Sequence, residues 1–190
     1  MWIDKHFIPW VVALGLSALV MLLAPVGSYA QLQTLTLDLE PAGDLYNVPA
    51  SVTLTNTGTT FNNFTGAVTL DYKARTTAST GSGTITVKAT TDFTCSSGGP
   101  CITSPPSTGD ALTYTCSGAT LGTNCSGTQT VSTTTATNVV TIAAGACTGG
   151  GAPCSTANPN TVTVNFTLTD DPKYQTGKYS ATLTWTISAS

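Results

Sequence analysis

The feature that most constrains this chain is a strict two-residue alternation near its C-terminal end. Residues 161–169 alternate apolar side chains with threonine or asparagine, and residues 179–188 repeat the pattern with threonine and serine as the polar set. A two-residue period places one side-chain set on each face of an extended strand. Residues 170–177 between them hold adjacent aspartates, a proline and a glycine, which favour a turn. The pattern predicts two half-buried strands joined by a turn.

Shorter segments of the same kind occur upstream. They cover Leu35–Leu39, Val52–Leu54, Val68–Tyr72, Ile85–Val87, Leu112–Tyr114 and Val139–Ile142. Asparagine, glycine and proline separate these segments, and no helical period follows residue 30. We therefore predict an all-β fold, an Ig-like β-sandwich of about eight or nine strands, formed by residues 31–190 as a single domain.

The first thirty residues have the order of a secretory signal peptide. Lys5 precedes an uncharged run over residues 10–26, and a small-residue pattern ends at Ala30. The alternative is an uncleaved membrane anchor, but this run rises only about 25 Å as a helix, less than the ~30 Å hydrocarbon core. We expect a signal-peptide helix over residues 1–30, contact with the membrane only through the uncleaved leader, and a secreted or cell-surface protein.

Cleavage after Ala30 removes the single histidine, His6. Nucleophile systems that depend on histidine and histidine-ligated metal sites are then excluded within one mature chain. Charged residues make up 8% of the chain, against ~25% in an average globular protein. This composition disfavours a nucleic-acid binder and a charged disordered tail. We expect no enzyme, no catalytic residue, no cofactor, no metal and no nucleic-acid partner.

All six cysteines follow the leader, and export would place them in an oxidising compartment. They form three close pairs, which are Cys95 with Cys101, Cys116 with Cys125, and Cys147 with Cys154. Sequential pairing is the simplest of the connectivities. Each bridge would then close a short loop and would stabilise the folded state by roughly 2–3 kcal/mol. A thiolate metal site is the alternative, but no C-x-x-C motif occurs. Residues 94–160, rich in cysteine and glycine, are expected to form stapled loops and short strands that decorate the sandwich.

Threonine recurs as Thr-x-Thr, for example at Thr84 and Thr86. Threonine is β-branched and suits an extended backbone, while its hydroxyl keeps an outer face hydrated without charge. An ice-binding ladder is a sharper hypothesis, but these pairs do not recur at a fixed interval along the sequence. Ordinary strand propensity therefore explains them.

Two further sets of residues are candidate sites. Sequons occur at Asn63, Asn124 and Asn165, about as many as chance predicts, and make these the candidate glycosylation positions. The acid clusters are Asp170 with Asp171, and Asp38 with Glu40 and Asp44. Either cluster could ligate Ca²⁺ or form a carboxylate dyad, but solvated turn acids are the more ordinary interpretation.

The segment over residues 31–41 bears most directly on function. Leu35, Leu37 and Leu39 alternate with polar residues before Pro41, and a flexible exit over residues 41–43 is expected to follow. This candidate donor strand could pair within its own sheet, or it could add to the open edge of another subunit. No cysteine stands directly after Ala30 for lipidation, and no apolar tail closes the chain. We therefore expect release, or retention by protein contacts.

Residues 177–187, Gly-Lys-Tyr-Ser-Ala-Thr-Leu-Thr-Trp-Thr-Ile, resemble the closing strand of secreted bacterial surface β-sandwiches. They are similar to the C-terminal motif of WxL cell-wall domains and to the terminal strand of coat-protein-U-type pilins. The upstream Trp-x-Leu motif of the first group and the N-terminal disulfide of the second have no counterpart here. The resemblance implies surface or fibre association and transfers no ligand-binding residue.

These observations predict a secreted structural protein, the subunit of an extracellular fibre, pilus-like or surface assembly that forms by donor-strand addition. Its expected partners are further copies of itself or other surface proteins. The alternative is a monomeric module that binds carbohydrate or cell wall, using the stapled loops of residues 94–160 as a rigid platform. In that case a glycan would be the partner.

Overall fold

The computed structural model of the 190-residue chain describes residues 34–56, 58, 60–97, 112–147, 151, 154 and 159–190. The expected signal peptide over residues 1–30 lies outside the described residues. Residues 39–190 form one compact unit, and the described residues 34–38 lie outside it. In the described part of the chain no helix is long and apolar enough to cross a bilayer.

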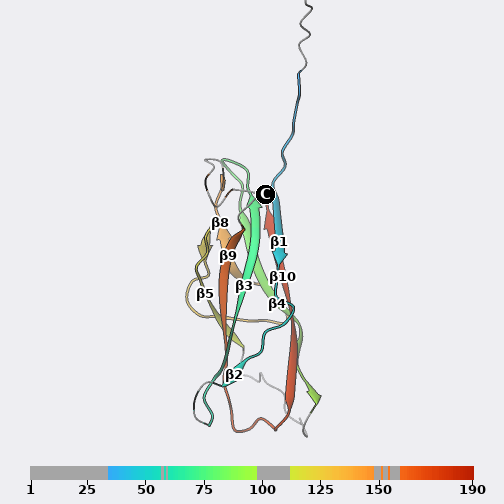
Figure 1. Cartoon of the computed structure of the whole chain (residues 1–190), viewed down its shortest axis with the longest axis vertical. Coiled ribbons are helices and arrows are strands. Elements are labelled where there is room, and N and C mark those ends of the chain that lie inside the picture. The colour runs from blue at the N-terminus through green and yellow to red at the C-terminus, as the bar shows by residue number, and fades with distance from the viewer. Residues whose placement is uncertain are drawn as a thin grey trace, which may run out of the picture. The chain divides into compact units, whose positions relative to one another are not determined.

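The described fold is all-β and consists of two antiparallel sheets (Figure 1). The larger sheet has the order β1-β3-β9-β5-β7, and β2 pairs with the beginning of β3. The smaller sheet has the order β10-β4-β8-β6. The strands are β1 (Ala42–Asn47), β2 (Thr55–Asn56), β3 (Phe64–Arg75), β4 (Gly83–Ser97), β5 (Thr113–Ser117), β6 (Thr123–Asn124), β7 (Gln129–Thr130), β8 (Thr137–Ile142), β9 (Asn160–Leu168) and β10 (Lys178–Ala189).

Alternation along β9 builds the centre of the larger sheet. Val162, Val164, Phe166 and Leu168 are buried, whereas the residues between them face outward. Strand β9 has neighbours on both sides, since β3 pairs along its whole length and β5 pairs from Thr163 to Thr167. A strand with partners on both sides and the other sheet above it buries its apolar set completely.

The two sheets pack on one common core. Buried side chains from both sheets form a single cluster, which includes Leu70, Tyr72, Tyr114, Val162 and Phe166 from the larger sheet and Ile85, Val87, Val139, Val140 and Ile142 from the smaller one. Phe166 links the sheets, because its ring centroid lies 6.0 Å from that of Tyr114 and 6.3 Å from that of Trp185 on β10. Such tilted aromatic contacts add to the energy of apolar burial.

Two predicted strands near the N-terminal end are wrong. Residues 35–39 form no strand, and the first strand instead begins at Ala42, inside the expected flexible exit. Residues 52–54 also form no strand, because the chain there crosses over Gly66 of β3 instead of pairing beside it. A Cβ atom on Gly66 would lie 2.8 Å from Leu54 Cδ2. A two-residue alternation cannot distinguish a paired strand from an extended crossing segment that packs one side on the core.

The sequence predicts that residues 94–160 form loops and short strands on the outside of the sandwich, but this region contributes to the sandwich itself. This region supplies β5, β6, β7 and β8, which belong to both sheets. Tyr114 and Val140 within it are almost completely buried. The strands are short and the turns rich in glycine, so local composition conceals their share of the core.

The disulfides follow sequential pairing where both partners are described. Cys116 bonds to Cys125 and Cys147 bonds to Cys154, with Cα atoms 5.4 Å and 5.2 Å apart respectively. Cys95 is also disulfide-bonded. Cys101 lies outside the described residues. Cys125 is buried in the core cluster, so the first of these bridges ties the short strands of this region to the main hydrophobic contacts.

Candidate functional site

The N-terminal arm, residues Thr34–Glu40, presents apolar side chains to solvent. It forms no strand, and Leu35, Leu37 and Leu39 are 91%, 76% and 62% exposed. Full burial of a leucine side chain is worth about 1.5–3 kcal/mol relative to exposure. Three leucines exposed at two-residue intervals on one short segment therefore favour a partner that covers them.

The root of this arm is held by Arg75, the last residue of β3. Its Nε donates a hydrogen bond of 2.9 Å to the carbonyl oxygen of Glu40, and its Nη2 donates to the same oxygen. The ladder between β1 and β3 begins at the same point, where Ala42 pairs with Arg75. The arm thus begins at a fixed position on the larger sheet, although its own backbone joins no ladder.

Strand β10 lies at one border of the smaller sheet and pairs with β4 alone among the described strands. Threonine and serine occupy its exposed face, and every apolar side chain on its inner face is only half-buried. That inner set is Tyr179, Ala181, Leu183, Trp185, Ile187 and Ala189. The matching set on β9 is almost completely buried. The difference arises because β9 has strands on both sides, whereas β10 has one.

An open hollow of about 290 Å³ lies beside the first half of β10. Leu112, Phe93 and Val131, with Ala181 and Leu183 of β10, supply its apolar lining, and Asp92, Thr130, Ser132 and Thr133 supply polar groups. The pairing of β10 with β4 is irregular here, with register shifts on both sides of Thr182. Bulges bend a strand and end regular pairing, which leaves room between the sheets.

Near the other end of β10 this space is closed. A Cβ atom on Gly43 of β1 would lie 2.9 Å from the Cγ1 atom of Ile187 on β10. The borders of the two sheets therefore approach each other around Ile187. The first half of β10, which contains Ala181 and Leu183, borders the hollow instead.

The sequon asparagines lie in different surroundings. Asn63 and Asn165 are exposed. Asn124 is half-buried, and its Oδ1 accepts a hydrogen bond of 2.9 Å from the backbone N–H of Ala119. The side chains of Asn63 and Asn165 are thus accessible from solvent, whereas Asn124 takes part in a turn.

The acidic residues act as turn and surface groups. The Oδ2 atom of Asp170 accepts a hydrogen bond of 3.3 Å from Asn56, and Asp171 forms an ion pair of 2.9 Å with Lys173. Asp38, Glu40 and Asp44 are exposed. Within the described ranges no three potential ligands among histidine, cysteine, aspartate and glutamate come together as a metal site.

Two buried tyrosines, Tyr72 and Tyr114, have hydroxyl groups whose pKa is shifted by the core around them. Burial raises the pKa of Tyr72, and a hydrogen bond that its hydroxyl donates to the carbonyl of Leu121 opposes that shift. Burial likewise raises the pKa of Tyr114, whose hydroxyl donates to the carbonyl of Asn138 at 2.8 Å. Each hydroxyl is neutral and satisfied, so these tyrosines connect the layers and supply no reactive group.

Comparison with known proteins adds no relative. The chain matches no protein-family model, and no curated protein is significantly similar to it in sequence.

Two features of the candidate site were not predicted from the sequence, namely the hydrogen bonds from Arg75 to the arm and the hollow beside β10. Neither has a local signal, because each joins segments that are distant along the chain.

Proposed function

We propose that this protein is an exported structural subunit with an Ig-like β-sandwich body, and that copies assemble outside the cell by strand addition. The N-terminal arm of one copy would lie along the open border of β10 in the next. The observation that carries this proposal is that one chain has both an exposed apolar arm and an apolar sheet border that is only half-covered.

The spacing of the arm leucines fits such an addition. Side chains two residues apart point to the same face of a strand, so the three leucines would all face the core beneath β10. There they would lie beside Leu183 and Trp185, and one would enter the hollow of about 290 Å³. Main-chain hydrogen bonds would supply affinity, and the buried leucines would set the register.

Other properties agree with an exported structural role. Disulfide bonds persist in oxidising compartments, and two of them lie within the described residues. A carbohydrate-binding module has less support. Tyr114, the aromatic residue of the stapled region, is only 1% exposed and offers no ring face for stacking on a sugar.

The test compares the mature chain, residues 31–190, with a chain that begins at Ala42. We expect the longer chain to form oligomers or filaments in size-exclusion chromatography and negative-stain microscopy, and the shorter one to be monomeric. A peptide of residues 31–41 should bind the shorter chain saturably. The same peptide with Leu37→Lys should bind at least about tenfold more weakly, the effect of losing a buried anchor.

A matched control uses the opposite face of the arm. The peptide with Thr36→Lys keeps all three leucines and should bind nearly as well as the unmodified peptide. Equal unfolding midpoints of the two chains would show that the truncation leaves the body intact. If both chains run as identical monomers and the unmodified peptide does not bind, strand addition is wrong.

A further inference from the structure

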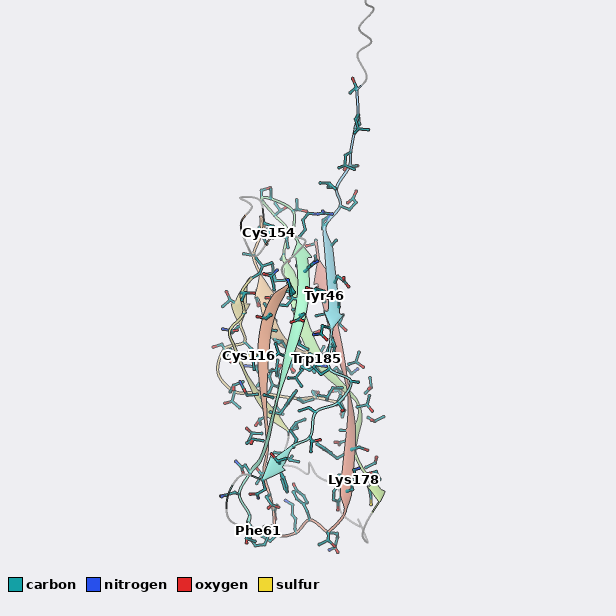
Figure 2. All side chains as sticks on the ribbon, viewed as in Figure 1. Tyr46, Phe61, Cys116, Cys154, Lys178 and Trp185 are labelled. Atoms are coloured by element: carbon teal, nitrogen blue, oxygen red, sulfur yellow. A yellow bond between two sulfur atoms is a disulfide. The ribbon has the colours of Figure 1, made fainter. Side chains whose placement is uncertain are left out.

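Two apolar features lie at opposite ends of the body formed by residues 39–190. Phe61 lies three residues before β3, and Arg75 ends the same strand, with residues 76–78 directly after it. A strand of 12 residues spans about 40 Å. Figure 2 shows Phe61 at one end of this body and Cys154 at the other. The two ends are therefore too far apart to touch within one copy.

Phe61 is presented to solvent in a strained conformation. Its side chain is 55% exposed and its φ is 64°, in the left-handed region that aromatic residues rarely adopt. The surrounding loop is held by Asn56, whose Nδ2 donates to the carbonyl of Asn62 at 2.6 Å and whose Oδ1 accepts from the N–H of Gly58 at 3.0 Å. Strain that the neighbouring contacts maintain is typical of functional positions.

The opposite end carries a hollow of about 270 Å³ next to the root of the arm. Its lining residues are Leu39, Pro41, Arg75, Thr76, Thr77, Ala78, Ala146 and Cys147. The Thr76 hydroxyl donates to the carbonyl of Ala143 at 2.8 Å and accepts from the N–H of Ala146 at 3.0 Å. This buried polar group is therefore satisfied, and the hollow is suited to an apolar occupant.

Size and backbone geometry agree with an aromatic occupant. A dry cavity of about 150 Å³ is enough to hold benzene, so a phenyl ring fits this hollow. The guanidinium of Arg75 at its wall can contact the face of a ring. Cys147 in this hollow, with φ of 75°, and Phe61 are the two described residues other than glycine that have positive φ.

We propose that Phe61 of one copy inserts into the hollow at the arm root of the next copy. Such a contact joins two different surfaces, so it repeats head to tail and produces a filament instead of a closed dimer. This inference rests on the proposed function, because it places both contacts between the same two copies. Lys178, where β10 begins, lies at the Phe61 end (Figure 2), so the arm would meet β10 at its more open half.

Cross-linking of the full mature chain tests this contact directly. Phe61→Cys and Ala78→Cys are introduced together, and a short bismaleimide is added with the native disulfides kept oxidised. We expect a ladder of dimers, trimers and longer species on a denaturing gel, since both cysteines of one copy lie about 40 Å apart. The control carries Tyr46→Cys with Ala78→Cys, because Tyr46 is also an exposed aromatic residue. Equal ladders from both pairs would overturn the proposal.

A second variant separates assembly from folding. Phe61→Gly removes the ring and suits the left-handed backbone, so its unfolding midpoint should equal or exceed that of the parent chain. Its critical concentration for assembly should rise roughly tenfold, as expected for loss of an aromatic anchor. If assembly depends on the arm but is unchanged by Phe61→Gly, this inference fails and the proposed strand addition stands. Leu37→Lys in the full mature chain is the matching change in the arm, because it leaves Leu39 and Pro41 of the hollow in place. If Phe61→Gly weakens assembly and Leu37→Lys does not, strand addition fails and the Phe61 contact alone is supported.

Discussion

At the scale of single residues, close backbone approaches decide where the chain can turn. Gly122 has φ of +96°, and a Cβ atom there would lie 2.6 Å from the carbonyl oxygen of Thr141 and 2.8 Å from Val140 Cγ1. Gly118 also has positive φ, at +68°, but a Cβ atom there would meet nothing within 4 Å. A side chain at Gly118 would therefore meet backbone strain alone, whereas one at Gly122 would meet both backbone strain and steric overlap.

We expect Gly118→Ala to lower the free energy of unfolding by about 1–2 kcal/mol, the cost of a left-handed residue with a side chain. Gly122→Ala carries this cost and also forces β8 to move, so it should lose about 1–3 kcal/mol more. Urea unfolding of both variants at neutral pH measures the difference. Equal losses would mean that the approach to β8 relaxes freely.

The buried tyrosines give the stability a defined pH dependence. Burial raises the pKa of Tyr72 and Tyr114 above the ordinary value of 10.0 that they regain on unfolding. Between the unfolded and folded pKa values the folded state binds more protons, so stability falls as pH rises above about 10. It should be constant, as far as these two groups are concerned, from neutral pH to about pH 9.

Urea midpoints measured from pH 8 to pH 11 check this prediction, with short incubations that keep the disulfides intact. Tyr114→Phe should lose a hydrogen bond, worth about 1 kcal/mol, at neutral pH. It should also make the decline above pH 10 shallower. A decline of unchanged slope in this variant and in Tyr72→Phe would assign the alkaline instability to other groups.

At the scale of elements, the disulfide from β5 to the residue after β6 stabilises strands that are too short to hold themselves. β6 and β7 have two residues each, and Cys125 packs in the core. The bridge closes a loop with a sequence separation of 9. Chain entropy then predicts that the bridge contributes about 2–3 kcal/mol.

The double variant Cys116→Ala with Cys125→Ala should therefore lower the free energy of unfolding by about 2–3 kcal/mol, or the melting temperature by roughly 5–10 °C. Cys147→Ala with Cys154→Ala is the matched comparison, since its loop has a similar separation of 7. Calorimetry of both variants tests whether each loss follows loop length. A loss at the first site far above that at the second would indicate core packing of Cys125 instead of chain entropy.

Elements also show how far alternation is predictive. The predicted strands at residues 161–169 and 179–188 are confirmed to within a residue or so as β9 and β10, because long alternation with buried partners leaves one stable arrangement. Residues 35–39 alternate equally well and form no strand. Alternation states which face can be buried, but a ladder partner decides whether a strand forms.

In the molecule as a whole, the features on which the proposed assembly depends are formed by segments that are distant along the chain. Arg75 and Glu40 meet at the arm root, and Ala181 and Leu112 line the same hollow beside β10. Phe61 and the hollow at the arm root lie at opposite ends of one strand, β3. A subunit with an apolar projection at one end and a hollow at the other is suited to repeat in one direction.

The exposure of the arm leucines was not predictable from the sequence, whereas the all-β class, the alternating faces and the sequential partners of the described disulfides were. These follow from local stereochemistry, since period, β-branching and loop length act between neighbours. Which border stays half-covered, where the two hollows lie and that residues 94–160 help to build the core became visible in the folded chain alone. Those outcomes depend on which strands pair across long separations, and side-chain identity specifies such pairing only when the whole core is packed.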